Sequence, residues 1–223
     1  MVKVLISSLI LFAAIASAQP IDIFLVSTLG KNALKNAEVA DLVKHLDRLY
    51  RDQSGLRFRI IEHRRIPDLF KKWNCLSGNC RLMRLRGWEG YFKKRSRGNH
   101  VLHLAILPPI WEQGKYWLGG YASGICTYRH SLPVAYAMAE MFNQDKAPRF
   151  ISSLTTLAHE VGHLLGATHR SDPPWNLNLM YVQVLAIANQ SYSVLKQIGS
   201  RFLPESLAEI QQCVGRKLSK PLW

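Results

Sequence analysis

The segment LAHEVGHLLGATHR, residues 157–170, carries the strongest structural signal in this chain of 223 residues. Apolar residues recur around it at helical spacing, which predicts a helix over Ile151–Leu165. Gly166 follows at a position where helices commonly end, because glycine readily adopts a positive φ. His159 and His163 are four residues apart, so their imidazoles lie on one face of the helix about one turn apart.

This spacing predicts a metal site. A sharp turn at Gly166 can bring His169 round to the two helical histidines. Three neutral imidazoles suit one Zn²⁺ per chain in tetrahedral geometry, with the fourth position open for water. Glu160 lies next to His159, where it can act as general base and acid. Peptide hydrolysis is the reaction that this set of groups serves best, because zinc acidifies its water and stabilises a developing oxyanion.

The alternative is that the histidines are ordinary polar groups on a buried helix. Three histidines beside an acid would then need many buried hydrogen-bond partners. The pattern also has five fixed positions, and its chance occurrence in a chain of this length is below about one in ten thousand. The metal site is therefore the favoured interpretation.

The pattern His159-Glu160-x-x-His163-x-x-Gly166-x-x-His169 resembles the zinc signature of the metzincin metalloproteases. A second family mark is a methionine turn beneath the metal. Asn178–Tyr181, NLMY, resembles that turn, and Met180 lies eleven residues after His169. The resemblance implies that Met180 forms an apolar floor under the histidines without binding zinc. Ordinary core packing is the alternative for a lone methionine.

Within the metzincins, the chain most resembles the adamalysin or reprolysin type. The run GGYASGIC, residues 119–126, is similar to the strand upstream of that group's helix, which pairs with substrate backbone at a sheet edge. The resemblance implies that substrate is bound by Gly119, Gly120, Tyr121 and Ala122. It also implies a disulfide between Cys126 and Cys213, which lie where that type joins this strand region to its C-terminal segment.

Further elements are expected on both sides of this segment. Apolar runs, alternation and helical periodicity predict strands at 21–28, 56–66, 101–107 and 117–126, and helices at 36–50 and 204–214. Strands and helices alternate early and helices dominate late, without a repeat or a linker. The expected fold class is therefore α/β (α+β) in one metzincin-like domain, with a mixed twisted sheet, an active-site helix and a helical C-terminal part below a zinc cleft.

Residues 1–18 have the pattern of a secretory signal peptide: Lys3, an apolar run, and the small-residue ending Ala16-Ser17-Ala18. A membrane anchor is the alternative, but the run is shorter than the roughly 20 residues that span a bilayer. The remaining chain, 19–223, is expected to be one secreted, extracellular and monomeric catalytic domain without a membrane anchor. A hydrophobic content of 48% excludes a disordered chain.

Export would place the four cysteines in an oxidising compartment. Three pairings are possible, and the simplest joins Cys75 to Cys80 locally and Cys126 to Cys213 over a long range. Asn189 begins the sequon Asn-Gln-Ser and is a candidate glycosylation site. Calcium binding is left open by the sequence.

The segment 57–97 is strongly basic, with thirteen Lys and Arg residues against three Asp and Glu, a local charge of +10. Aromatic residues are interleaved with the charges. In an exported protein this tract suggests binding to heparin-like glycosaminoglycans or acidic protein surfaces rather than to nucleic acid. A solvated face that only promotes solubility is the alternative.

Two functions follow from these features. The first is a secreted zinc endopeptidase that cleaves extracellular proteins or peptides. The second is a weak or inactive protease scaffold that binds anionic surfaces through the basic tract. The presence of Glu160 and all three histidines favours the enzyme.

Overall fold

The computed structural model describes residues 20–29, 34–67, 69, 78–95, 101–107, 110–112, 115–117, 120–123, 126, 135–140, 149–170, 178–180 and 201–217. The predicted signal peptide, 1–18, lies outside these residues, and its assignment stays a prediction. No helix in the described ranges has the length and apolar character needed to cross a membrane.

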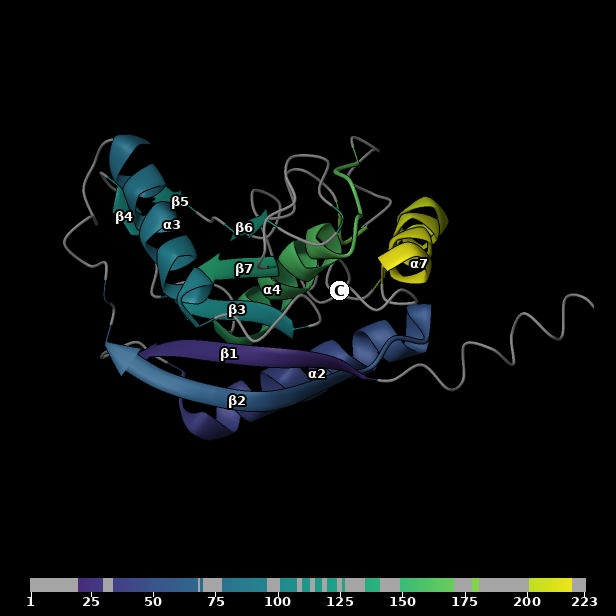
Figure 1. The fold of residues 1–223 in the computed structure, drawn as a ribbon, viewed down its shortest axis with the longest axis horizontal. Helices are drawn as coiled ribbons and strands as arrows, with labels where there is room; N and C mark the ends of the chain where they lie inside the picture. Colours follow the sequence, from purple (N-terminus) through teal and green to yellow (C-terminus); the bar gives the residue numbers. More distant parts are fainter. Residues whose placement is uncertain are drawn as a thin grey trace, which may run out of the picture.

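A mixed sheet of five strands, in the order β2-β1-β3-β7-β6, forms the centre of the described fold (Figure 1). The strands β2, β1, β3 and β7 run parallel, and β6 pairs antiparallel with β7. Their bounds are β1 Ile21–Leu29, β2 Phe58–Pro67, β3 Val101–Leu107, β6 Gly120–Ser123 and β7 Ala135–Glu140. A separate antiparallel hairpin is formed by β4, Ile110–Glu112, and β5, Lys115–Trp117.

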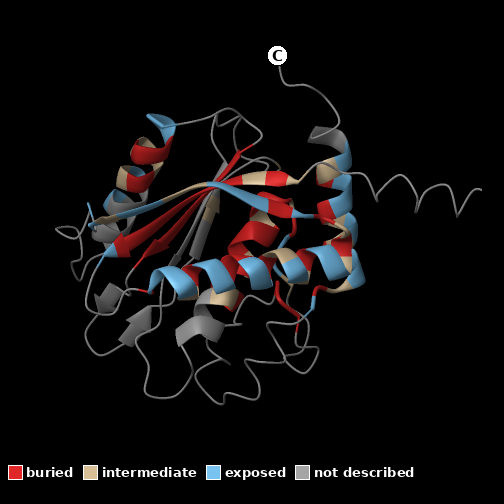
Figure 2. Cartoon of the chain, turned by 90° about the horizontal axis from the view of Figure 1, so that it is seen from below, coloured by how far each residue is buried: buried red, intermediate tan, exposed pale blue. Residues whose placement is uncertain are grey.

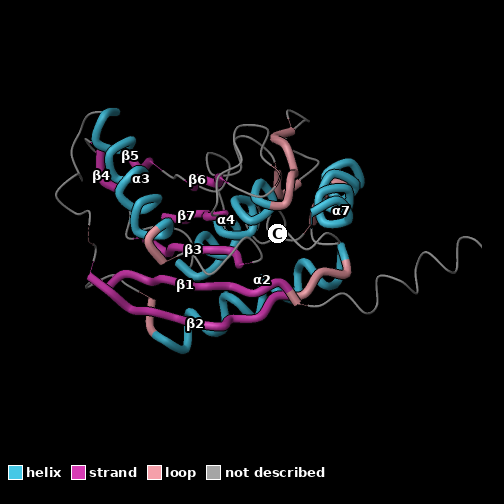
Figure 3. The backbone as a smooth tube through the Cα atoms, in the orientation of Figure 1, coloured by secondary structure: helices cyan, strands magenta, loops and turns pink. Residues whose placement is uncertain are grey.

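Helices cover both faces of this sheet, which explains why β1 and β3 are almost continuously apolar. Ile23 and Leu25 of β1 belong to the core shared with α2, Asn36–Ser54, and α4, Arg149–Leu164. The alternate residues Phe24 and Val26 pack with Trp88 and Phe92 of α3, Gly78–Lys93, on the other face. The molecule is therefore a layered α/β structure, as predicted, and Figure 3 shows the sheet and its helices in one view.

The helix α2 presents the apolar stripe that the sequence predicts. Val39, Leu42, Val43, Leu46 and Tyr50 are buried, while the opposite side of the helix is exposed (Figure 2). The helix extends to Ser54, four residues beyond its predicted end, and stops at Gly55 with φ 74°.

Four described elements were not anticipated from the sequence: α3, β7 and the two strands of the hairpin, β4 and β5. The helix α3 has many basic residues and lacks a clear apolar stripe, so its periodicity is weak. The strand β7, AYAMAE, is rich in good helix formers, yet it pairs in register with β3. Pairing within a buried sheet outweighs intrinsic preference there. Among the described residues, the strand predicted over 117–126 contributes only Gly120–Ser123 to the sheet, at its edge.

The helix α4 carries the histidine motif and contacts α2, β6 and β7. Leu157, Ala158, Val161, Leu164 and Leu165 are all buried, as predicted. The C-terminal helix α7, Pro204–Lys217, lies beyond the C-terminal end of α4 (Figure 1). Ile210 of α7 belongs to the same core as α4. This packing fixes the frame in which the motif's side chains meet.

Candidate metal centre

The three histidines of the motif converge. The Nε2 atoms of His159 and His163 are 3.1 Å apart, those of His163 and His169 are 3.0 Å apart, and those of His159 and His169 are 3.2 Å apart. Helical spacing brings the first two together, and the chain beyond α4 brings the third. The sequence prediction of one converged group is therefore met by the geometry.

The outer ring nitrogens orient the first two imidazoles. His159 Nδ1 donates to the carbonyl oxygen of Leu179 at 2.6 Å, and His163 Nδ1 donates to that of Ala167 at 2.8 Å. Donation at Nδ1 leaves the Nε2 lone pair directed into the triad. Metal-binding histidines are commonly held in this way, with the outer nitrogen bound to a carbonyl.

The donor set fits zinc. Tetrahedral coordination with Zn–N bonds of 2.0–2.1 Å separates ligand nitrogens by about 3.3–3.4 Å, close to the 3.0–3.2 Å found between the three Nε2 atoms. Three imidazole nitrogens also match the ligand type that zinc prefers. In the described part of the chain, the group of possible metal ligands here consists of these three residues.

Burial keeps these imidazoles neutral. Burial, together with the smaller effect of the adjacent His163, lowers the pKa of His159 to about 3, although its bond to Leu179 opposes the decrease. Burial likewise lowers the pKa of His163 to about 4, although its bond to Ala167 opposes the decrease. The pKa of His169 is lowered for the same reason. Neutral imidazole is the form that binds a metal, so the site is prepared for one at neutral pH.

The turn after α4 is held by glycine and by backbone bonds. Gly166 has φ 96°, and its N–H bonds to the carbonyl of His163 while that of Ala167 bonds to Gly162. These two bonds form a Schellman motif. A Cβ on Gly166 would also lie 3.2 Å from the Cβ atoms of Cys126 and Cys213. Both the backbone conformation and the packing therefore require glycine here.

Cys126 and Cys213 form a disulfide, which is the long-range pairing expected from the sequence. It joins the segment after β6 to α7 across a sequence separation of 87 residues. Its position against Gly166 places this link directly beneath the turn that leads to His169. The other expected pair, Cys75 with Cys80, involves Cys75, which lies outside the described residues.

The segment 178–180 forms a tight turn below α4. Asn178 Oδ1 accepts from the N–H of Met180 at 2.8 Å, and the N–H of Leu179 bonds to the carbonyl of Arg201. The carbonyls of the turn face the motif, since Leu179 receives His159 Nδ1 and Met180 receives the N–H of Arg170. The turn therefore orients His159 and holds the backbone of Arg170, the residue that follows His169.

Met180 packs directly against the metal-site helix. Its side chain is fully buried, and a Cβ on Gly162 would lie only 2.6 Å from Met180 Sδ. A side chain at position 162 would thus collide with the methionine. The role of Met180 as an apolar floor under the histidines stays a prediction.

Glu160 is buried, with 6% of its surface exposed. Burial, and to a smaller degree the nearby Glu160 charge, raises the pKa of Tyr50 well above its usual value. The Tyr50 hydroxyl donates to the carbonyl of Ala158 at 2.7 Å, one residue before the motif begins. The helix α2 thereby braces α4 at the metal site.

Comparison with known proteins identifies the architecture. No protein-family model matches the sequence, and no curated protein shows significant sequence similarity to it. The chain is similar to the crystal structure of archaemetzincin from Methanopyrus kandleri, with a TM-score of 0.55, 16% identity, and coverage of 90% of this chain and 98% of that one. The fold is metzincin-like. This agrees with the fold class expected from the motif.

A second similar structure is metalloproteinase-II from Bacteroides fragilis, with a TM-score of 0.47, 18% identity, and coverage of 88% of this chain and 54% of that one. A third is OgpA from Akkermansia muciniphila, with a TM-score of 0.41, 16% identity, and coverage of 86% and 61%.

The remaining predicted site residues are only partly described. Gly120, Tyr121 and Ala122 lie in β6, and Ala122 packs against the core that includes α4. Gly119 and the predicted glycosylation site Asn189 lie outside the described residues.

The contacts of several residues that shape the site were not predicted from the sequence. Asn178 has a recognisable signal, since asparagine often caps the N–H two residues ahead. Tyr50 and Glu209 have no such signal in the sequence, because only the tertiary structure brings α2 and α7 to the motif.

Proposed function

We propose that this protein is a zinc-dependent endopeptidase. The observation that carries the proposal is the convergence of three Nε2 atoms within 3.0–3.2 Å, with the outer nitrogens of His159 and His163 bound to carbonyls. A site of three imidazoles with an open position is typical of catalytic rather than structural zinc. The metzincin-like fold supports the same conclusion.

Each residue then has a defined task. The metal would be held by Nε2 of His159, His163 and His169, and zinc bound there would supply a Lewis acid able to polarise a carbonyl and acidify water. Glu160 accepts a proton from water and delivers it to the leaving amine nitrogen. Its burial strengthens its electrostatic effect on nearby charge. Met180 excludes water from below the imidazoles, because its side chain is buried against α4.

The test is zinc content together with cleavage of a denatured protein substrate. The purified protein should contain about one zinc per chain, lose cleavage after treatment with a chelator, and regain it when zinc is restored. A protein that takes up zinc at this ratio yet cleaves no substrate in a broad peptide library would refute the endopeptidase proposal.

We also propose that the protein is secreted. The support is the signal-peptide pattern of residues 1–18 and the Cys126–Cys213 disulfide, which is favoured in an oxidising compartment. N-terminal sequencing of protein from the medium of expressing cells should start at Gln19. Retention of the intact chain inside the cells would contradict this proposal.

For substrate, we propose that an extended peptide pairs with the edge strand β6. Strand addition at a sheet edge uses main-chain hydrogen bonds, and β6 is at the edge of the described sheet. This strand and the Cys126–Cys213 link also support kinship with the reprolysin type. Peptides with N-methylated backbone amides near the scissile bond should be cleaved less efficiently than unmodified peptides.

A second proposed role is contact with anionic polysaccharides through the basic tract. Exposed Arg59, Arg64 and Arg65 lie along the edge strand β2. Two of them are partly neutralised, since Arg59 pairs with Asp22 at 2.7 Å and Arg64 pairs with Glu62. Retention on a heparin column well above physiological salt would support this role, whereas elution near physiological salt would leave only a solvated basic face.

A further inference from the structure

The third histidine is held differently from the other two. His159 and His163 lie within α4, whereas His169 follows the turn after that helix and is exposed. Among the described residues, no carbonyl bond to His169 Nδ1 is present to match those of the helical histidines. The contacts that the structure describes on either side of it are made by Thr168 and Arg170.

Both neighbours of His169 bind one carboxylate, that of Glu209 on α7. Glu209 Oε2 accepts the backbone N–H of Thr168 at 2.9 Å, and Oε1 accepts the Thr168 hydroxyl at 3.0 Å. Oε1 also forms an ion pair with the Arg170 guanidinium at 2.8 Å. One side chain thus receives donors from the residues before and after His169.

The Glu209 carboxylate accepts the first backbone N–H that follows the helix cap. The Schellman bonds use the N–H groups of Gly166 and Ala167, so the next one, that of Thr168, has no carbonyl partner within the turn. Glu209 is the acceptor for it. On the C-terminal side of His169, the N–H of Arg170 bonds to the carbonyl of Met180 at 2.9 Å. The segment 168–170 is therefore fixed at both ends.

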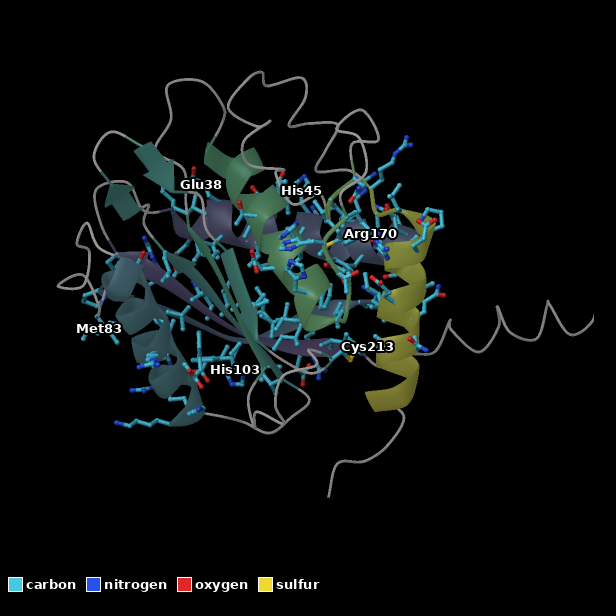
Figure 4. The ribbon with its side chains drawn as sticks, turned by 90° about the horizontal axis from the view of Figure 1, so that it is seen from above. Glu38, His45, Met83, His103, Arg170 and Cys213 are labelled. Carbon is cyan, nitrogen blue, oxygen red and sulfur yellow. A yellow bond between two sulfur atoms is a disulfide. The ribbon has the colours of Figure 1, made fainter. Side chains whose placement is uncertain are left out.

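The platform that carries Glu209 is rigid. Ile210 of α7 is in the core, and Cys213 is bound to Cys126 beneath Gly166. The side chains of Arg170 and Glu209 are 24% and 29% exposed, so their pair is more shielded than an ordinary surface ion pair. In Figure 4, Arg170 lies beside α7, the helix that also bears Cys213.

We propose that Glu209 is a positioning residue for the metal centre, which holds His169 Nε2 at the distance that zinc requires. The proposal rests on the proposed zinc function. Groups that orient metal ligands typically alter metal affinity by 10- to 100-fold when they are removed. Glu209 acts here through Thr168 and Arg170 rather than through the imidazole itself, which extends the metal centre to the C-terminal helix.

The test compares Glu209→Ala with Glu205→Ala in the full chain. Glu205 is a matched control, because it is an exposed glutamate one turn earlier on the same helix and has no contact with residues 168–170 in the described structure. Zinc affinity is measured by competition with a chromophoric chelator. The visible spectrum of the Co²⁺-loaded protein reports the ligand geometry independently of activity and of overall stability.

Glu209→Ala should weaken zinc binding by about 10- to 100-fold and change the Co²⁺ spectrum. Glu205→Ala should leave both as in the unmodified protein. The zinc affinity of Glu209→Gln should lie between those of Glu209→Ala and Glu205→Ala, because the glutamine amide keeps one acceptor oxygen. Equal zinc affinity and equal spectra for Glu209→Ala and Glu205→Ala would overturn the proposal.

Three further outcomes are also decisive. If Glu209→Ala does not fold, Glu209→Gln and Thr168→Val are measured instead, and unchanged zinc affinity in both overturns the proposal. If the unmodified protein binds zinc but cleaves nothing, the endopeptidase function fails while the affinity comparison still decides the role of Glu209. Absence of zinc binding in the unmodified protein would overturn both.

Discussion

Replacement of Gly162 by alanine tests whether Met180 supports the metal-site helix. The new Cβ would lie 2.6 Å from Met180 Sδ, 3.3 Å from Met180 Cε and 3.3 Å from Phe202 Cε1. Met180 is fully buried and Phe202 is nearly so, hence neither can move aside into solvent. Overpacking of this kind costs about 1–3 kcal/mol, while the change from glycine to alanine within a helix contributes about 0.8–1.0 kcal/mol in the opposite direction.

The matched control is Gly90→Ala in α3, where a new Cβ would meet nothing within 4 Å. Gly90→Ala should stabilise the protein by about 0.5–1 kcal/mol. Gly162→Ala should therefore be about 1–3 kcal/mol less stable than Gly90→Ala, which corresponds to a melting temperature lower by roughly 2–12 °C for a chain of this size.

The same substitution should also weaken zinc binding. Met180 is joined to Leu179, whose carbonyl receives His159 Nδ1, so displacement of the methionine disturbs the orientation of that imidazole. Thermal unfolding of the metal-free protein and zinc competition together measure both effects. In a double variant that also carries Met180→Ala, the total loss of stability should be smaller than the sum of the losses in the two single variants, because alanine at 180 removes the collision. Equal stability of Gly162→Ala and Gly90→Ala would refute the reasoning.

Three other outcomes are expected. Glu160→Ala should keep zinc but lower kcat by several powers of ten, since the proton acceptor is gone; full activity would contradict its role. The metal-free protein should lose stability as pH falls below about 6.5, by about 1.4 kcal/mol per pH unit for each buried histidine. The sign follows because the pKa values of His159 and His163 are lowered to about 3 and about 4, so the unfolded chain takes up protons first. Urea unfolding at pH 7.5 and pH 5 measures this slope, which should become smaller when both are replaced by glutamine. Replacement of Cys126 and Cys213 by serine should cost about 2–5 kcal/mol, because their link closes a long loop; an unchanged urea midpoint would show that the link does not constrain the chain.

The elements with a clear period were predictable from local sequence. The stripes of α2 and α4 and the apolar runs of β1 and β3 are found close to their predicted bounds, because each can bury its apolar face in only one way. By contrast, β7 is composed of residues that favour a helix, and its strand exists because β3 and β6 lie on either side of it.

The same division applies to the metal centre. Spacing alone places His159 and His163 together on one helical face, and it permits a third ligand after Gly166. Helical geometry is local, so those inferences need no knowledge of the rest of the chain. The three histidines and Glu160 could thus be proposed before any coordinates, whereas the methionine turn was proposed from the family resemblance.

Only the tertiary structure decides how those residues are held. Met180 meets Gly162, Leu179 receives His159, and Glu209 binds both neighbours of His169, over sequence separations of 18, 20 and about 40 residues. Contacts of this kind depend on how α4, α7 and the turn pack together, and no local period encodes them. The sequence by itself determines which atoms can bind a metal, whereas packing determines whether they lie at the distances that a metal requires.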